Sequence, residues 1–172
     1  MEYAELHAHS YYSLLDGASA PTALVARAAE LGLSALALTD HDNLIGAVEF
    51  VKAAEARGIK SILGAELTLR TGHHLTVLAA DAQGYRNLCR LISLAHRAQA
   101  KGQAALPVEA LAAHHDGLFL LSGCARGELA TALRERRWSD AQQIVRRYLD
   151  LVGRDRFWIE LQHHRLPNDR WL

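Results

Sequence analysis

The sequence lacks the features expected of an exported or membrane-bound protein. Its 172 residues include only two cysteines, too few for a disulfide framework and typical of a protein in a reducing compartment. The chain does not open on a basic segment followed by an apolar run, so we expect no signal peptide. No apolar run approaches the roughly 18 residues of a membrane span, so we expect no membrane partner. These absences predict a cytoplasmic protein.

A surplus of positive charge is also missing. Lys plus Arg and Asp plus Glu number 19 each, so the formal net charge is zero. Because nonspecific affinity for a phosphate backbone needs excess Lys and Arg, this chain alone is not expected to bind nucleic acid strongly. A neutral domain can still act on nucleic acid when other domains hold it. Half of the residues are apolar, which is enough for one domain with a real core.

Strand and helix patterns alternate along almost the whole chain, without a long low-complexity linker or a fixed-period repeat. Apolar runs predict strands, with a hairpin turn at Gly72, at about residues 3–7, 35–39, 59–66, 67–70, 74–80, 118–122 and 157–162. Helical spacing predicts helices at about 21–32, 44–57, 83–97, 128–136 and 138–152, with a short one after Pro107. Repeated strand–helix–strand units imply an α/β fold with a mostly parallel sheet.

The strand count fits a barrel that has not closed. A full barrel of alternating strands and helices usually needs about 250 residues. The sequence is shorter and stops just after its last predicted strand. We therefore expect it to be the N-terminal part of a longer protein.

Side chains that bind metals follow the predicted strands. His7 and His9 are two residues apart on a strand, so they share a face and can bind one ion. An isolated pair of this kind is about equally often two partly exposed histidines, so the spacing is weak evidence alone. Asp16 precedes a glycine, where a simple turn aspartate is the commoner role.

The next two strands carry further candidates. Asp40 and His41 follow the second strand, while Asp42 or Asn43 is expected to cap the following helix. Glu66 ends a very apolar strand, and burying it without a cation partner would be costly. Glu66 is therefore the natural bridge between two metals.

Later candidates are a histidine and a cysteine. Strand alternation places His74 on the same side as Thr76 and Leu78. Cys124 follows a strand, where a thiolate ligand and simple packing are about equally expected. Cys89 lies on an apolar helix face and is expected to pack in the core.

Together these residues predict one polynuclear metal site at the rim where a barrel of this kind does its chemistry. The predicted metal ligands are His7, His9, Asp16, His41, Glu66, His74 and Cys124. The predicted catalytic residues are His7, His9, Asp16, Asp40, His41 and Glu66. Imidazole and carboxylate ligands with one thiolate suit zinc, and also manganese or iron.

Across residues 1–172, these motifs resemble the PHP (polymerase and histidinol phosphatase) family. The blocks that carry the resemblance are His7-x-His9, Asp16, Thr39-Asp40-His41, Gly64-Ala65-Glu66, His74 and Ser122-Gly123-Cys124. The sequence is most similar to the PHP domain that begins bacterial C-family DNA polymerases, both replicative alpha subunits and error-prone relatives. That similarity rests on residues 6–17, 74–80, 84–88 and 160–167.

The resemblance implies a distorted, TIM-like barrel of seven strand–helix units, C-terminally incomplete in this chain, with up to three divalent metals. His7, His9 and Glu66 would hold one metal. Glu66, His74 and Cys124 would share a second, and Asp16 and His41 would hold a third. His164 matches a histidine common near this point in polymerase relatives.

The implied activity is metal-assisted phosphoester hydrolysis in a chain that is also a DNA-directed DNA polymerase. The implied substrate is a DNA 3′ end, giving proofreading, or pyrophosphate, and the implied partners are the other polymerase domains. Two alternatives remain, namely a free-standing small-molecule phosphatase and a non-catalytic scaffold of the polymerase.

One departure from the family pattern is clear. The family closes its site with Asp-x-His near the final strands, and the nearest match, Asp169-Arg170-Trp171, is wrong. Truncation is the simplest explanation, in agreement with the length.

Overall fold

A six-stranded sheet forms the centre of the fold, in the order β1-β2-β3-β4-β5-β6. The computed structural model describes residues 3–97, 99–100 and 102–164. The strands are Ala4–Glu5 (β1), Ala35–Leu38 (β2), Lys60–Thr68 (β3), His74–Ala79 (β4), Leu118–Leu121 (β5) and Phe157–Trp158 (β6). Residues 165–167, part of the polymerase-like stretch, and Asp169-Arg170-Trp171 lie outside the described residues.

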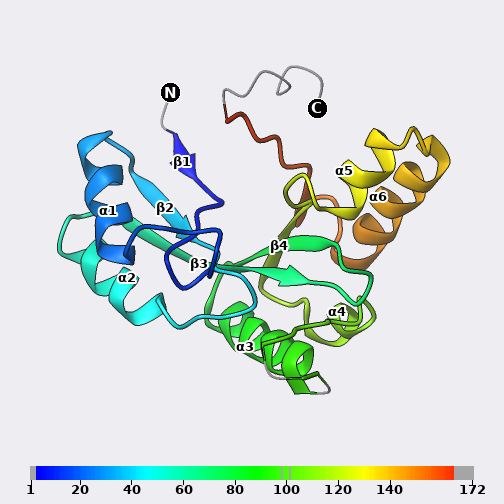
Figure 1. Ribbon diagram of the computed structural model, residues 1–172, viewed down its shortest axis with the longest axis horizontal. Coiled ribbons are helices and arrows are strands. Elements are labelled where there is room, and N and C mark those ends of the chain that lie inside the picture. The colour runs from blue at the N-terminus through cyan, green and yellow to red at the C-terminus, as the bar shows by residue number, and fades with distance from the viewer. Residues whose placement is uncertain (1–2, 98, 101, 165–172) are drawn as a thin grey trace.

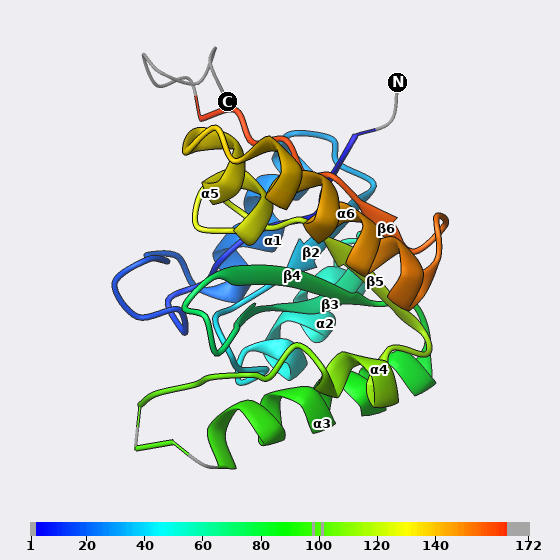
Figure 2. The same ribbon diagram turned by 90° about the vertical axis from the view of Figure 1, so that its right-hand side faces the viewer.

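Helices cover the outer, convex side of the curled sheet (Figure 1). They are Pro21–Glu30 (α1), Ala47–Glu55 (α2), Ala82–Arg97 (α3), Ala110–His114 (α4), Glu128–Arg134 (α5) and Trp138–Val152 (α6). Figures 1 and 2 show α3 and α4 together below the sheet, while α5 and α6 lie beside β5 and β6. This arrangement confirms the predicted α/β fold with an incomplete, barrel-like sheet.

One strand of the mostly parallel sheet is reversed. The pairs β1–β2, β2–β3 and β5–β6 are parallel, whereas β4 is antiparallel to both β3 and β5. The predicted hairpin is present, and it reverses β4 within an otherwise parallel sheet. As a consequence, the N-terminal end of β4 lies at the same edge as the C-terminal ends of its neighbours.

The two faces of the sheet have different roles. On β3, Ala65 and Leu67 point outward into a core that includes Leu88 and Leu91 of α3. Ile62 points to the other face, where it packs near Ala37, Leu78 and Leu121. Because successive strand residues alternate between faces, Glu66 lies on the inner face with Ile62. The alternation thus places a charged side chain inside the curve of the sheet.

The sheet ends in two very short edge strands, β1 and β6, which are shorter than predicted. Between them lies a cavity of about 950 Å³, lined from both edges and by inner-face residues such as Ile62 and Phe119. A closed barrel would fill this space with further strands. None of the helices in the described part of the chain has the length and apolar character needed to span a membrane.

Close packing of α3 against the turn before β5 gives a first prediction. A Cβ on Gly84 would lie 1.9 Å from the main-chain oxygen of Gly117, so the backbone would have to move. Gly84→Ala should lower the free energy of unfolding by about 1–3 kcal/mol, as overpacking does. Urea denaturation measures the change. Ser93→Ala, on the exposed face of α3, should cost at most about 0.5 kcal/mol, and equal losses would contradict this account.

Candidate metal centre

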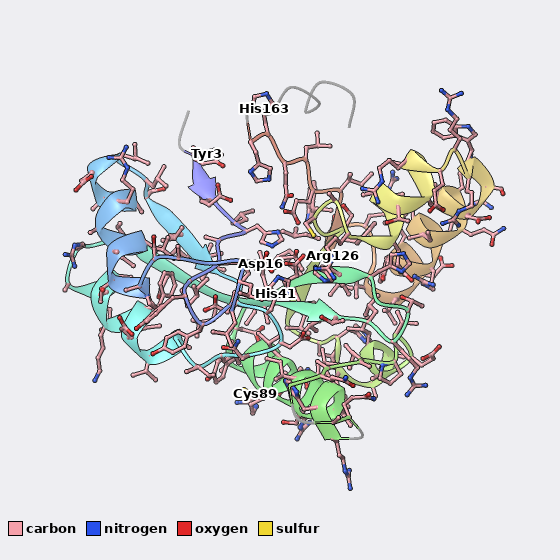
Figure 3. The ribbon with its side chains drawn as sticks, in the orientation of Figure 1. Tyr3, Asp16, His41, Cys89, Arg126 and His163 are labelled. Carbon is pink, nitrogen blue, oxygen red and sulfur yellow. The ribbon has the colours of Figure 1, made fainter. Side chains whose placement is uncertain are left out.

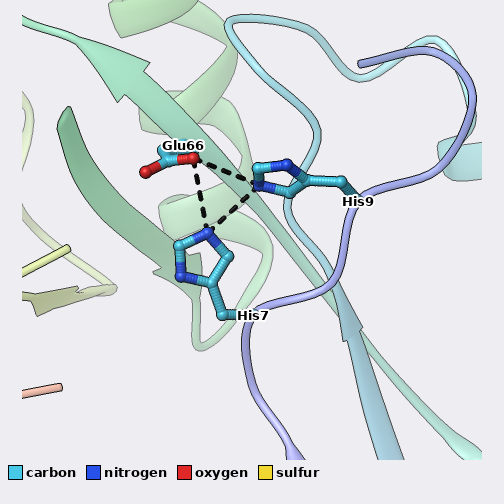
Figure 4. A group of neighbouring side chains, drawn as sticks. All are labelled: His7, His9 and Glu66. Carbon is cyan, nitrogen blue, oxygen red and sulfur yellow. Dashed lines mark hydrogen bonds and ion pairs between the residues drawn. The ribbon is translucent and has the colours of Figure 1, made fainter. Parts of the chain in front are cut away.

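Glu66 is the centre of a cluster of four histidines. Its side chain is only 1% exposed, although it carries a charge. The Oε2 atom lies 3.4 Å from His7 Nε2, 3.2 Å from His9 Nε2 and 3.2 Å from His41 Nε2, and Oε1 lies 3.0 Å from His74 Nδ1. Figure 4 shows His7 and His9 converging on the carboxylate. Among the described residues, no Lys or Arg makes a salt bridge with Glu66.

Four neighbouring strands supply these side chains. His7 and His9 follow β1, and the Thr39 amide donates to Ala8 O at 2.9 Å, which holds this segment beside the end of β2. His41 follows β2 and forms a bridge with Glu66 of β3. The predicted position of His74 at the start of its strand is confirmed, whereas Glu66, expected at the end of a strand, lies inside it. His74 begins β4, which reaches the same edge because it runs antiparallel.

Asp16 and Cys124 lie at the margins of the cluster. Asp16 Oδ2 is 3.0 Å from His41 Nε2, and its side chain is 54% exposed. Cys124 Sγ is 3.6 Å from His74 Nδ1. The structure therefore brings all seven predicted ligands into one region. Ligand atoms lie within 4.8 Å of one another in the groups His7–His9–Glu66, His9–Asp16–His41 and His41–Glu66–His74.

Hydrogen bonds within the cluster shift the pKa values of Glu66 and His7. Burial alone would raise the pKa of Glu66, but hydrogen bonds from His7, His74 and His9 outweigh it and lower the pKa. Burial would lower the pKa of His7, yet hydrogen bonds to Glu160 and Glu66 raise it to about 9. Burial lowers the pKa of His41. Glu66 is thus held as an anion at neutral pH.

The donor set fits a divalent ion. Four imidazoles around a carboxylate, with a second carboxylate and a thiol at the margins, are ligands that zinc accepts, as do manganese and iron. Burial, followed by the effect of Glu66, raises the pKa of the Cys124 thiol to about 12. Cys124 is therefore a protonated thiol in the metal-free cluster.

Asp40 is not in this cluster, although it was predicted to be catalytic. It is 1% exposed, and its oxygens accept from Ser10 N at 2.7 Å, Ser10 Oγ at 2.7 Å and Ser13 Oγ at 2.6 Å. Ser13 Oγ also accepts from the amide of His41 at 3.0 Å. Asp40 therefore fastens the loop that carries Asp16 to the segment that carries His41.

The expected helix cap is wrong. The α2 helix begins later than predicted, at Ala47, with Gly46 as its N-cap and no side-chain cap. Asp42 instead accepts from Thr68 N at 2.8 Å and Thr68 Oγ1 at 2.7 Å. Its φ of 52° is the left-handed conformation, which Asp adopts more readily than most residues other than glycine. Asp42 thus ties the His41 segment to β3.

Glu160 was missed as a site residue. It follows β6, and its Oε1 atom lies 2.5 Å from His7 Nδ1. Residues 160–167 carry part of the family resemblance, but the resemblance assigns no role to the Glu160 side chain. The signal was the same as for Glu66, a carboxylate at the end of an apolar strand.

Other candidates lie away from the cluster. Figure 3 shows Asp16 and His41 near the middle of the fold, with Cys89 on α3 and His163 near the end of the described chain. Cys89 is partly exposed in a surface groove with Arg90 and Ser93, so the expected core position is wrong. His164 is exposed, and its Nε2 lies 3.4 Å from Gln162 Oε1.

Removing the Asp40 anchor should destabilise the protein. Asp40→Ala leaves the buried polar groups of Ser10 and Ser13 without their acceptor, and each such group costs about 1–3 kcal/mol. We expect the free energy of unfolding of the metal-free protein to fall by at least about 2 kcal/mol. Urea denaturation measures it. Asp16→Ala, in the same loop but exposed, should change it by at most about 0.5 kcal/mol, and a similar loss in both would contradict the anchor role.

Comparison with known proteins identifies the family. The PHP domain profile matches residues 5–164. The chain is 45% identical over 188 positions to an error-prone DNA polymerase of Symbiobacterium thermophilum, covering 100% of this chain and 17% of that protein. It is 41% identical over 184 positions to the DNA polymerase III subunit alpha of Treponema pallidum, covering 99% and 16%. The chain therefore spans about one sixth of the length of these relatives.

Solved structures agree on the fold. An amidohydrolase from Chromobacterium violaceum aligns with a TM-score of 0.53 at 21% identity, covering 81% of this chain and 73% of that one. A two-domain Bacteroides vulgatus protein containing a PHP-like metal-dependent phosphoesterase aligns with a TM-score of 0.51 at 21% identity, covering 77% and 41%. With the match over residues 5–164, the chain belongs to the PHP domain family and matches the PHP domain of bacterial C-family DNA polymerases.

Proposed function

We propose that this chain is the metal-dependent phosphoesterase domain of a bacterial C-family DNA polymerase. The observation that carries the proposal is the buried Glu66 carboxylate, surrounded by four imidazoles and with no Lys or Arg among its ion pairs in the described chain. Such a set of donors is arranged for a cation. A divalent ion bound here would supply Lewis-acid stabilisation of phosphoryl oxygens and an activated water.

The residues of the cluster have distinct tasks in this proposal. Glu66 faces all four imidazoles and is placed to bridge two ions, while His7 and His74 form the covered side. His9, His41 and Asp16 are the more exposed members, with side chains 17%, 19% and 54% exposed. A phosphate ester would therefore approach from the Asp16 side, where solvent also reaches the cluster.

The proposed substrate is the 3′ end of a DNA primer, with pyrophosphate as the small-molecule alternative. Relatives about six times as long are DNA polymerases, which supports polymerase domains as partners that hold DNA near this domain. The zero net charge of the chain agrees with such a division of labour, because the chain itself offers little general attraction for phosphates.

Glu66 should control metal content more than any other single ligand. Glu66→Ala removes the negative charge that would lie between two bound cations and reduce their repulsion. Glu66→Gln removes the charge while keeping the side-chain size. Both variants should lose most of their bound zinc or manganese in elemental analysis of purified protein. Glu30→Ala, an exposed carboxylate on α1, serves as the control. Wild-type metal content in both Glu66 variants would refute the bridging role.

Hydrolysis should be separable from polymerisation in the complete polymerase. The His7→Ala/His9→Ala double variant should lose metal-dependent removal of 3′ nucleotides while retaining DNA synthesis, because synthesis belongs to other domains. Parallel assays on a 3′-labelled primer and on pyrophosphate measure this and separate the two substrates. His73→Ala, at a partly exposed position beside His74, is the matched histidine control.

One result of that experiment would change the assignment. Hydrolysis at the wild-type rate in the double variant would mean that the cluster is not catalytic and that the domain is a scaffold. The isolated chain should be a poor phosphoesterase in either case, since its sequence has no Asp-x-His pair to complete the family's ligand set.

A further inference from the structure

The two edges of the sheet meet at the metal centre, where the ring of His7 contacts Glu160 and Gln162. His7 follows β1 at one edge, and Glu160 follows β6 at the other. His7 Nδ1 lies 2.5 Å from Glu160 Oε1, although the residues are 153 positions apart. No strand pairing joins β1 to β6 in the described chain, so this contact bridges the open side of the barrel at the level of the cluster.

The Glu160 carboxylate is held firmly in place. Its side chain is 9% exposed. Thr76 Oγ1 of β4 donates to Oε2 at 3.2 Å, and Gln162 Nε2 donates to Oε1 at 2.6 Å. The Glu160 amide donates to Ser122 Oγ, beyond the end of β5, at 2.9 Å. Groups on β4, after β5 and after β6 therefore hold the carboxylate in place independently of its contact with His7.

This placement determines which nitrogen of His7 faces the cluster. An ionised carboxylate only accepts hydrogen bonds, so Nδ1 must carry the proton in the contact with Glu160. The other nitrogen, Nε2, then points inward, 3.4 Å from Glu66 Oε2 and 3.1 Å from His9 Nε2. A carboxylate behind a histidine in this way orients the ring and makes it a better ligand.

We propose that Glu160 is a positioning residue that fixes the orientation and tautomer of His7 for metal binding. It does not itself join the ligand groups around Glu66, since its partner is the far nitrogen of the ring. The proposal rests on the metal-binding role of the cluster given above. It adds to that role a residue that follows the last described strand, so that a complete His7 site requires both edges of the sheet.

The test is the zinc affinity of the chain, measured by competition with a chromophoric chelator. Glu160→Ala should weaken zinc binding by about 10–100-fold, the usual cost of losing such a partner. Glu160→Gln keeps the shape and one acceptor oxygen, so it should fall between Ala and wild type. Glu5→Gln is the matched control, because Glu5 accepts from the main-chain amide of His7 at 3.1 Å and not from its ring. Its affinity should equal that of wild type.

A spectroscopic measurement on the zinc-loaded protein separates positioning from general loss of structure. Imidazole ¹⁵N shifts should show His7 protonated at Nδ1 and zinc-bound at Nε2 in wild type, and a mixture of tautomers in Glu160→Ala. Unchanged affinity in Glu160→Ala, equal losses in Glu5→Gln, or zinc on Nδ1 in wild type would each overturn the proposal. A wild-type chain that binds no zinc would instead refute the proposed metal site as well.

Discussion

The buried negative charge of Glu66 is the constraint around which the rest of the site is arranged. A carboxylate that is 1% exposed is costly to ionise unless its environment compensates the charge. Here the compensation comes from imidazoles, which can either donate hydrogen bonds or give up their protons to a cation. A Lys or Arg in the same place would neutralise Glu66 permanently. Histidines instead leave room for an exchangeable positive charge, and this property makes the cluster suitable for a metal.

The fold supplies the geometry for that arrangement. Alternation along β3 turns Glu66 inward while Ala65 and Leu67 anchor the strand in the outer core. The reversal of β4 brings His74 to the same edge. Two aspartates then hold the ligand segments together. Asp40 fastens the loop that carries Asp16, and Asp42 ties the His41 segment to Thr68 of β3. Neither aspartate needs to touch an ion to determine where the ligands lie.

Much of this could be predicted from the sequence, because the signals were local. The strand–helix alternation follows from apolar spacing, and the ligands cluster because His7, His9 and His41 follow adjacent strands. The hairpin turn at Gly72 also predicts the reversed direction of β4, which brings His74 to the edge of the sheet where the other ligands lie. The roles of Asp40 and Asp42 depend on contacts with Ser13 and Thr68, respectively. The place of Glu160 after an apolar strand marks it as a candidate, but its contact with His7 spans 153 positions, and no spacing rule can reveal that partner.

The most direct measurement of the central claim is a crystal structure of the chain soaked with zinc, using anomalous scattering to locate the ions. The account predicts an ion bonded to Glu66 and to Nε2 of His7 and His9 at about 2.0–2.2 Å. Zinc bound only at surface histidines such as His163, with Glu66 still contacting imidazoles alone, would contradict it.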